Sequence, residues 1–298
     1  MLSLLISLWI SATLTLLCTP FALAEANQDK DTEIYKFAVT DIVGLEELQR
    51  EFTAFQDTLA RYTGHRFQLF PVTGRTIVVE SFRNRRLDFA LIGPAEYVAV
   101  HSRTEVIPLV GLERENYRAA LIARANSGLN SIQDLAGKKI AFGDFGSTSY
   151  HLAPLQLLAE NGMNDTSRVR MVNVNKYVSW KSLLRSQVDA IGFNYNRFEQ
   201  FIAEDPKLHR EDFRVLALTP ILPSDLFVAG SHVPAAVQEK VRLAFQEHGE
   251  SLLNAMLQGK RNAKYLNMSF KTNITNDDYQ YIRQMYKTAG LESLAGHS

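Results

Sequence analysis

The chain has almost no cysteine, because Cys18 is the single one among 298 residues. It lies in an apolar N-terminal stretch that we expect to be removed on export, so the mature chain would have no thiol. A disulfide framework, a Cys-ligated zinc site and a cysteine nucleophile are therefore excluded together. The length corresponds to about two domains, which are large enough to be stabilised by their own cores.

An excess of charge is also lacking, since 32 Lys and Arg residues balance 32 Asp and Glu residues. A nucleic-acid partner normally requires a basic excess, so we expect none. The seven histidines form no His-x-His or His-Glu-x-x-His pair, so no metal site or other cofactor is expected. Hydrophobic residues make up 46% and charged residues 21%, which is ordinary globular composition.

Long apolar runs are missing except at the N-terminus. Residues 1–24 contain no charged residue and end in Ala22-Leu23-Ala24, the small-x-small pattern of a signal-peptidase site. We therefore predict a signal peptide over 1–24 and export to the periplasm. Because no Lys or Arg precedes the apolar run, a retained membrane anchor is the alternative. No later run reaches the roughly 18 residues that a spanning helix needs.

Strand and helix patterns alternate through the rest of the chain. Buried-strand patterns occupy 34–40, 67–71, 87–93, 117–124, 139–142, 168–174, 190–193, 213–218 and 226–229. Helical spacing occupies 45–63, 75–85, 152–161 and 179–186, followed by a mostly helical C-terminal region. Such alternation predicts an α/β fold with mainly parallel sheets flanked by helices.

Two lobes are predicted, without a flexible linker between them. The strand patterns at 117–124 and 213–218 are the best candidates for the crossings and bracket a block of domain size. We expect lobe 1 to comprise 33–120 plus 218–298 and lobe 2 to comprise 121–217.

The segment 138–154 carries the most chemical information. A strand pattern ends in a glycine-containing loop, and Gly146 is followed by Ser147, Thr148 and Ser149 at the start of a helix. Helix-start N–H groups, the positive end of the helix dipole and three hydroxyls suit an oxyanion. The spacing matches neither a P-loop nor a nucleophile elbow. The alternative is that one hydroxyl simply caps the helix.

Five segments in order resemble a known family: LDFALIGPAEY (87–97), SIQDLAGKKIAFGD (131–144), GSTSYHLAP (146–154), QVDAIG (187–192) and ILPSDLFVA (221–229). Together they resemble the periplasmic solute-binding proteins of phosphate, phosphite and phosphonate ABC transporters, over roughly residues 37–228. The resemblance implies a hinged, two-lobed type II periplasmic-binding fold with the ligand between the lobes. It also implies a membrane permease with its ATPase as partner.

The resemblance also implies site residues. The family's Ser-Thr-Ser turn binds the oxyanion, and Tyr150 here replaces its usual next residue, glycine. Lys176 falls where aminophosphonate binders have a histidine, and Arg75 where they have an aromatic residue. Asp225 matches one amine-binding carboxylate, whereas Asn196 replaces the other. The residues expected at the ligand are Gly146, Ser147, Thr148, Ser149, Lys176, Arg75, Asp225, Tyr97 and Asn196.

For several of these residues a structural explanation stays open. Arg75 and Lys176 would then be solvated surface residues, and Asp225 would cap its own Pro-Ser-Asp turn. Tyr97 would belong to the core. One lost carboxylate and two gained cations argue against 2-aminoethylphosphonate, so we expect a small tetrahedral oxyanion or a phosphonate without an amine.

The sequence thus favours a monomeric, exported receptor that captures a small phosphorus oxyanion for an ABC importer. One alternative is a sensory protein of the same fold that acts on a membrane kinase or chemoreceptor. Another is a receptor for a different oxyanion, such as a sulfonate. A phosphate-ester hydrolase that uses Ser147 as nucleophile is least supported, because no base or metal-ligand set accompanies it.

Overall fold

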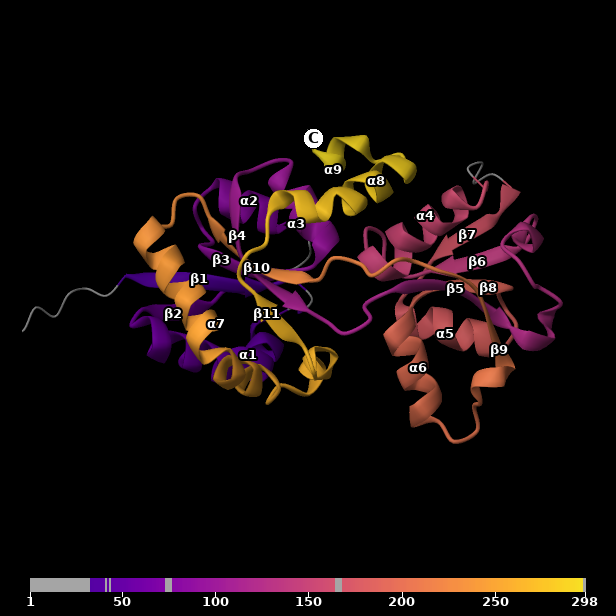
Figure 1. The fold of residues 1–298 in the computed structure, drawn as a ribbon, viewed down its shortest axis with the longest axis horizontal. Coiled ribbons are helices and arrows are strands. Elements are labelled where there is room, and N and C mark those ends of the chain that lie inside the picture. Colours follow the sequence, from indigo (N-terminus) through magenta and orange to yellow (C-terminus); the bar gives the residue numbers. More distant parts are fainter. Residues whose placement is uncertain (1–32, 41, 43, 73–76, 164–167, 297–298) are drawn as a thin grey trace, which may run out of the picture. The chain divides into compact units, whose positions relative to one another are not determined.

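Two mixed β-sheets, each covered by helices on both faces, organise the computed structural model (Figure 1). The structure describes residues 33–296 except 41, 43, 73–76 and 164–167. The predicted signal peptide and Arg75 lie outside the described residues. Within the described part, no helix combines the length and the apolar character needed to cross a membrane.

The first sheet has six strands in the order β11-β4-β10-β3-β1-β2. They are β1 (Ile34–Val39), β2 (Arg66–Leu69), β3 (Phe89–Ile92), β4 (Val106–Glu113), β10 (Asp225–Gly230) and β11 (Ser269–Lys271). On one face lie α1 (Leu45–Thr63) and α7 (Ala235–Met256), and on the other lie α2 (Ile77–Arg83), α3 (Pro94–His101), α8 (Gln280–Thr288) and α9 (Glu292–Ala295). Phe37 of β1 packs towards α1, whereas its neighbour Ala38 packs towards the opposite face. Burial on both faces explains why the second half of β1, residues 37–39, is a continuous apolar run.

The second sheet has five strands in the order β7-β6-β8-β5-β9. They are β5 (Ala119–Arg124), β6 (Lys139–Phe142), β7 (Arg170–Asn173), β8 (Ala190–Asn194) and β9 (Phe213–Leu218). One face is covered by α4 (Ala153–Glu160), and the other by α5 (Lys176–Leu184) and α6 (Tyr195–Glu204). A π-helical turn, η3 (Thr148–Leu152), leads directly into α4. The short 3-10 helices are η1 (Ala125–Ser127), η2 (Gln133–Leu135), η5 (Arg210–Asp212), η6 (Lys260–Tyr265) and η7 (Asn276–Tyr279).

The sheets are mixed, which corrects the expectation that they are mainly parallel. Strand β1 runs parallel to β2 and β3, and β6 runs parallel to β7 and β8. By contrast, β10 is antiparallel to β3 and β4, and β5 is antiparallel to β8 and β9. Parallel neighbours follow from helical crossovers within one sheet. Strands β5 and β10 instead arrive from the other sheet through short connections without a helix.

These two connections, residues 114–118 and 219–224, lie side by side. The backbone N–H of Leu222 donates to the carbonyl of Tyr117 at 2.8 Å, and that of Thr219 donates to the carbonyl of Ala119 at 2.9 Å. Along the chain, the strands of the five-stranded sheet therefore start with β5 and finish with β9. The lobe boundaries predicted at 120–121 and 217–218 stay a prediction.

The C-terminal helix α8 forms a further connection between the sheets. The Tyr281 hydroxyl donates to the carboxylate of Glu160 on α4 at 3.1 Å. Leu152 and Ala153, at the start of α4, belong to the same buried cluster as Ile282 and Met285 of α8. This apolar contact joins residues from both sheets in one compact unit.

Candidate functional site

A cavity of about 1120 Å³ lies at the carboxyl ends of the parallel strands. Its lining includes residues that directly follow β1, β3, β6, β7 and β8, together with η6 and the crossover at 114–117. Ligands of open α/β sheets bind at this edge, because loops and helix N-termini converge there. The cavity lies beside residues 147–149, which the sequence predicted to contact a ligand.

Helix starts surround this cavity, and two of them are capped by side chains. The Asn175 side chain accepts a hydrogen bond from the N–H of Tyr177 at 2.9 Å, and that of Asn194 accepts one from the N–H of Arg197 at 2.8 Å. At η3 the capping position belongs to Ser147, whose side chain forms no capping bond within the described structure. The first N–H groups of a helix have no intrahelical acceptor. This uncapped helix start is consequently open to an external anion.

The three hydroxyls at this helix start have different partners. Thr148 Oγ1 accepts a hydrogen bond from the backbone N–H of Ala95 at 3.1 Å, which joins η3 to the start of α3. Ser149 Oγ accepts one from Asn194 Nδ2 at 3.2 Å. The Ser147 hydroxyl makes no hydrogen bond to any described residue, although only 8% of the residue is exposed. Ser147 is therefore the hydroxyl with its full capacity available to a ligand.

Lys176 and Asn196 also line the cavity. Lys176 is the first residue of α5, and its ammonium lies 5.9 Å from the ring centre of Tyr150 and 5.3 Å from that of Tyr177. Asn196, on α6, donates from Nδ2 to the backbone carbonyl of Glu115 at 2.8 Å. Both side chains are thus at the site, one as a cation and the other as an amide tied to the crossover.

Two predicted residues are not brought to the cavity. The backbone N–H of Gly146 donates to Nδ1 of His151 at 3.2 Å. Tyr97 is fully buried, its hydroxyl donates to Asn276 Oδ1 at 3.1 Å, and burial raises its pKa to about 12. Its neighbour Glu96 lines the cavity instead, because successive side chains on a helix point in different directions. Tyr97 therefore has the core role that was its alternative.

Asp225 lines the cavity but is surrounded by donors. Its Oδ1 accepts from Arg114 Nη2 at 2.9 Å, and its Oδ2 accepts from the Tyr265 hydroxyl at 2.9 Å, with the Lys264 ammonium at 3.5 Å. Asp225 is 5% exposed. Its partners are distant in sequence, so it does not act as a cap of its own turn. A carboxylate with two cationic partners is a poor acceptor for a third.

Arg114 lines the cavity but is not among the residues that the sequence predicted. It lies in the crossover at residues 114–118, between β4 and β5, where the sequence alone does not distinguish it from an ordinary charged loop residue. Burial lowers the pKa of Arg114, but the Asp225 carboxylate together with Tyr117 and Tyr265 raises it more, so the pKa lies above its usual value and the guanidinium stays charged. Only the fold brings this cation to the cavity.

Charges of both signs line the cavity. Among the described residues, the cations are Arg114, Lys176, Arg197, Lys260, Arg261 and Lys264, and the carboxylates are Glu96, Glu115, Asp144, Glu204 and Asp225. Because the signs nearly balance, the preference for an anion comes from where helix ends and cations are placed rather than from net charge. No group of three or more His, Cys, Asp or Glu residues suitable for a metal occurs in the described part of the chain.

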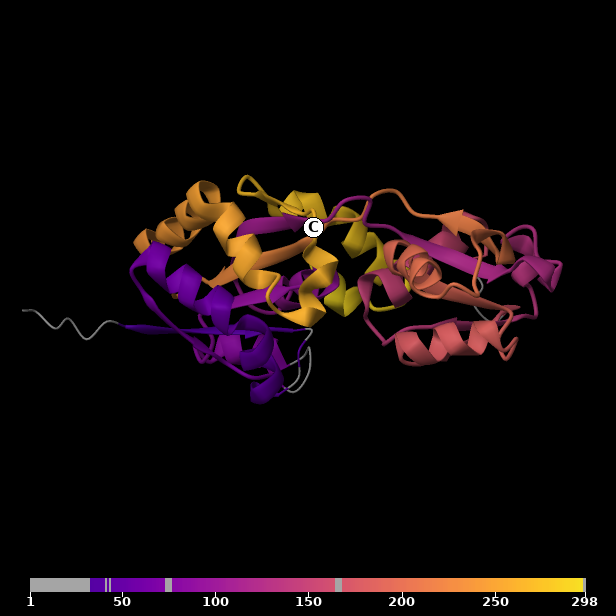
Figure 2. The ribbon, with the colours of Figure 1, turned by 90° about the horizontal axis from the view of Figure 1, so that it is seen from below.

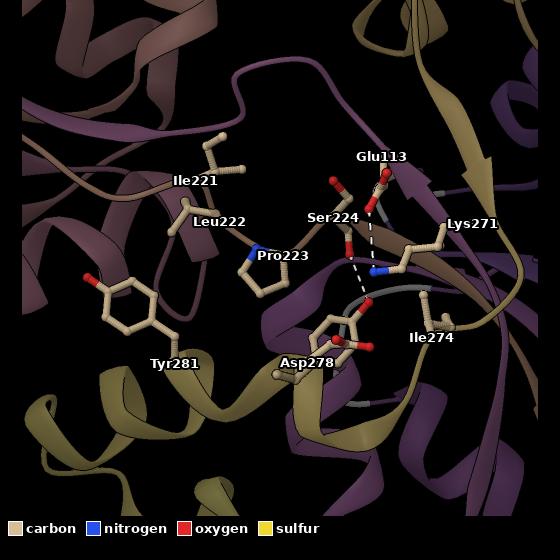
Figure 3. A pocket seen from close by; sticks show the side chains of 11 residues that line it. Glu113, Ile221, Leu222, Pro223, Ser224, Lys271, Ile274, Asp278 and Tyr281 are labelled. Atoms are coloured by element: carbon tan, nitrogen blue, oxygen red, sulfur yellow. Dashed lines mark hydrogen bonds and ion pairs between the residues drawn. The ribbon is translucent and has the colours of Figure 1, made fainter.

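A second, smaller cavity of about 310 Å³ lies against the other side of the 219–224 crossover (Figure 3). Its walls include Ile221 and Leu222 of the crossover and Tyr281 of α8. An ion pair between Lys271 and Glu113 at 3.8 Å and a hydrogen bond from the Tyr279 hydroxyl to the Ser224 carbonyl at 3.3 Å cross it. The Tyr279 bond fastens the crossover to η7 next to Asp225, whereas the ion pair joins β11 to the end of β4.

Comparison with known proteins identifies relatives of this fold and site. A curated relative, the phosphate-import protein PhnD of Mycolicibacterium smegmatis, is 29% identical over 124 residues, and the match spans 39% of each chain. PhnD1 of Prochlorococcus marinus, solved in complex with methylphosphonate, has a TM-score of 0.63 and 18% identity, with 87% of this chain and 98% of that one covered. XAC2383 of Xanthomonas citri, solved bound to ATP, has a TM-score of 0.70 and 14% identity, with 88% and 98% covered.

At these identities the solved structures show the fold alone, which is the two-lobed fold of periplasmic binding proteins. The family described as "ABC transporter, phosphonate, periplasmic substrate-binding protein" matches residues 37–279, most of the chain. The chain therefore belongs to the family of periplasmic substrate-binding proteins of phosphonate ABC transporters.

Proposed function

We propose that this protein captures a small phosphorus oxyanion without an amine, such as phosphate, phosphite or an alkylphosphonate. The observation that carries the proposal is the uncapped helix start at residues 147–149, where the Ser147 hydroxyl has no described partner. Backbone N–H groups, a free hydroxyl and the helix dipole together form a site for a tetrahedral anion.

The residues at the two carboxylate positions of the family support a ligand without an amine. Asp225, which would receive the ammonium group, already accepts hydrogen bonds from Arg114 and Tyr265 and lies 3.5 Å from the Lys264 ammonium. At the second carboxylate position stands Asn196, whose neutral amide carries no negative charge to balance an ammonium group. An aminophosphonate would thus bring its positive charge into a region that already contains cations.

The remainder of the proposal concerns the path of the ligand. After removal of residues 1–24 the protein acts in the periplasm as a monomer and delivers its ligand to an ABC permease with its ATPase. We assign it binding rather than catalysis, because within the described residues no base contacts the Ser147 hydroxyl to activate it.

A larger anion is a second candidate, because the cavity of about 1120 Å³ exceeds the needs of a small oxyanion. Pockets for drug-sized ligands span roughly 300–1,000 Å³. XAC2383, which shares the fold, was solved with ATP. A nucleotide phosphate would occupy the same helix start, and its remaining groups would reach the cationic residues of η6.

A thermal-shift panel tests both candidates. It contains phosphate, phosphite, methylphosphonate, 2-aminoethylphosphonate, sulfate, taurine and ATP. A true ligand at 100 times its Kd stabilises the fold by about 2.7 kcal/mol. We expect a shift with at least one amine-free phosphorus oxyanion, and ATP alone would favour the second candidate. No shift with any phosphorus compound, or a shift with taurine only, would refute the proposal.

Variants then locate the ligand. Ser147→Ala removes a hydrogen bond to a charged group and should weaken the best ligand by about tenfold or more. Ser127→Ala, which removes an exposed hydroxyl from the same lobe, is the matched control and should leave the affinity unchanged. Equal affinities in the two variants would contradict the placement of the ligand at η3.

A further inference from the structure

We propose that Arg114 is the second anion-binding group of the cavity and selects amine-free oxyanions. This inference rests on the proposed function and names the residue that would determine its specificity. It is argued from four observations on Arg114 and its neighbours Tyr117 and Asp225.

The first observation is that Arg114 is held rigidly. Its backbone N–H donates to Ser224 Oγ at 3.1 Å, and its Nη2 donates to Asp225 Oδ1 at 2.9 Å. The guanidinium also lies over the Tyr117 ring, with its carbon 3.6 Å from the ring centre. The two crossovers thus fix one cation in one orientation before any ligand arrives. A fixed guanidinium loses little conformational freedom when it binds an oxyanion.

The second observation is an unsatisfied donor. Arg114 Nε is buried and has no hydrogen-bond partner among the described residues, while its side chain is 13% exposed. Buried donors of native proteins are nearly always paired, because leaving one unpaired is unfavourable. Since Arg114 lines the cavity, a bound oxyanion is the acceptor that fits.

The third observation connects Arg114 with the helix start at residues 147–149. Tyr117 stacks under the guanidinium, and its hydroxyl also hydrogen-bonds Ser149. A single side chain therefore separates Arg114 from the hydroxyls at η3. One tetrahedral anion can contact both, with N–H and hydroxyl donors on one side and a planar guanidinium on the other.

The fourth observation concerns Asp225. Together with Arg114 and Lys264 it forms a cluster of two cations and one carboxylate. An ammonium group that approached Asp225 would therefore meet two cations already in place, whereas an oxyanion would be attracted by both. In this arrangement Asp225 is a positioning residue for Arg114, and its acceptors are not available to the ligand.

Isothermal titration with phosphate, phosphite, methylphosphonate and 2-aminoethylphosphonate tests the inference. Arg114→Met alone leaves Asp225 with a single cation, so the double variant Arg114→Met/Asp225→Asn removes both charges of the pair. We expect this double variant to bind the best amine-free ligand at least about 30-fold more weakly than wild type. Arg114→Lys should also bind more weakly, because it keeps the charge but loses the planar fork.

Arg83→Met is the matched control, because it removes an exposed arginine that pairs with Glu80 at 3.0 Å and does not line the cavity. This variant should bind each ligand with the wild-type Kd. A purely structural role of Arg114 would lower the melting temperature of the ligand-free double variant while its Kd stayed at the wild-type value. That result would overturn the inference.

The outcomes also distinguish this inference from the proposed function. If Ser147→Ala loses binding and the Arg114 variants do not, the function stands and the role of Arg114 is wrong. If wild type binds none of the four compounds, the proposed function fails and the inference fails with it. If 2-aminoethylphosphonate binds more tightly than methylphosphonate, the selection against amines is wrong.

Discussion

His151 should make the fold sensitive to mild acid. Its ring is 5% exposed, accepts a hydrogen bond from the Gly146 N–H through Nδ1, and lies 4.9 Å from the ring of Phe145. Burial lowers the pKa of His151 from 6.5 to about 4. The folded protein therefore keeps this imidazole neutral down to about pH 4, with Nδ1 as acceptor. In the unfolded chain the imidazole becomes protonated as the pH falls below 6.5.

The sign of the effect follows from this difference. Above pH 6.5 neither state is protonated at this site and the free energy of unfolding is unaffected. As the pH falls from 6.5 to about 4, the unfolded state binds the proton first, so stability decreases. At about 1.4 kcal/mol for each unit of pKa, the full loss is about 3 kcal/mol.

Urea unfolding at a series of pH values from 7 to 4 measures this loss. His151→Asn is the informative variant, because the Asn oxygen can accept from Gly146 but does not titrate. We expect it to be less stable than wild type at pH 7 and to lose about 3 kcal/mol less on acidification. Ser127→Ala, which removes an exposed hydroxyl that does not titrate in this range, should show the pH dependence of wild type. Parallel curves for wild type and His151→Asn would refute the reasoning.

Three further predictions concern the same region. Thr148→Ala leaves the buried N–H of Ala95 without its acceptor and should lower the free energy of unfolding by about 1–3 kcal/mol in a urea titration, whereas Thr148→Ser should not. Gly143→Ala would place a methyl group 2.4 Å from Cβ of Tyr150 and should cost about 1–3 kcal/mol. In the Tyr150→Gly variant, Gly143→Ala should cost much less stability. An equal loss in that variant and in wild type would contradict the clash. Trp180 is 7% exposed and packs in the core, so added phosphate should leave acrylamide quenching of its fluorescence unchanged, and a large change would contradict this placement.

Local sequence rules predicted much of the fold. The helix Leu45–Thr63 was predicted with its observed bounds, because its apolar spacing is regular and Gly64 adopts the left-handed conformation that ends it. Strands 139–142 and 213–218 also have their predicted bounds. Strand β4 was missed, since Pro108 and Gly111 interrupt its pattern, and Pro108 lies beside an irregularity in the pairing with β10.

The candidate site was less accessible to sequence reasoning than the fold. The turn at residues 147–149 was found because its donors are consecutive in the chain. Arg114 was not found, because its partners Ser224 and Asp225 are more than a hundred residues away and only the paired crossovers bring them together. Tyr97 was assigned to the ligand through the family motif, but the orientation of α3 turns its side chain into the core.

The packing of α8 against α4 sets a direction for ligand release. On that side the two halves are joined by Tyr281 and by the apolar contact of Ile282 and Met285. The halves cannot separate there without exposing buried surface to water. Residues of η6 and α6 line another part of the rim of the cavity. We therefore expect the two halves to separate where η6 and α6 line the cavity rather than at α8. A transporter that takes up the ligand would then have to contact these two elements.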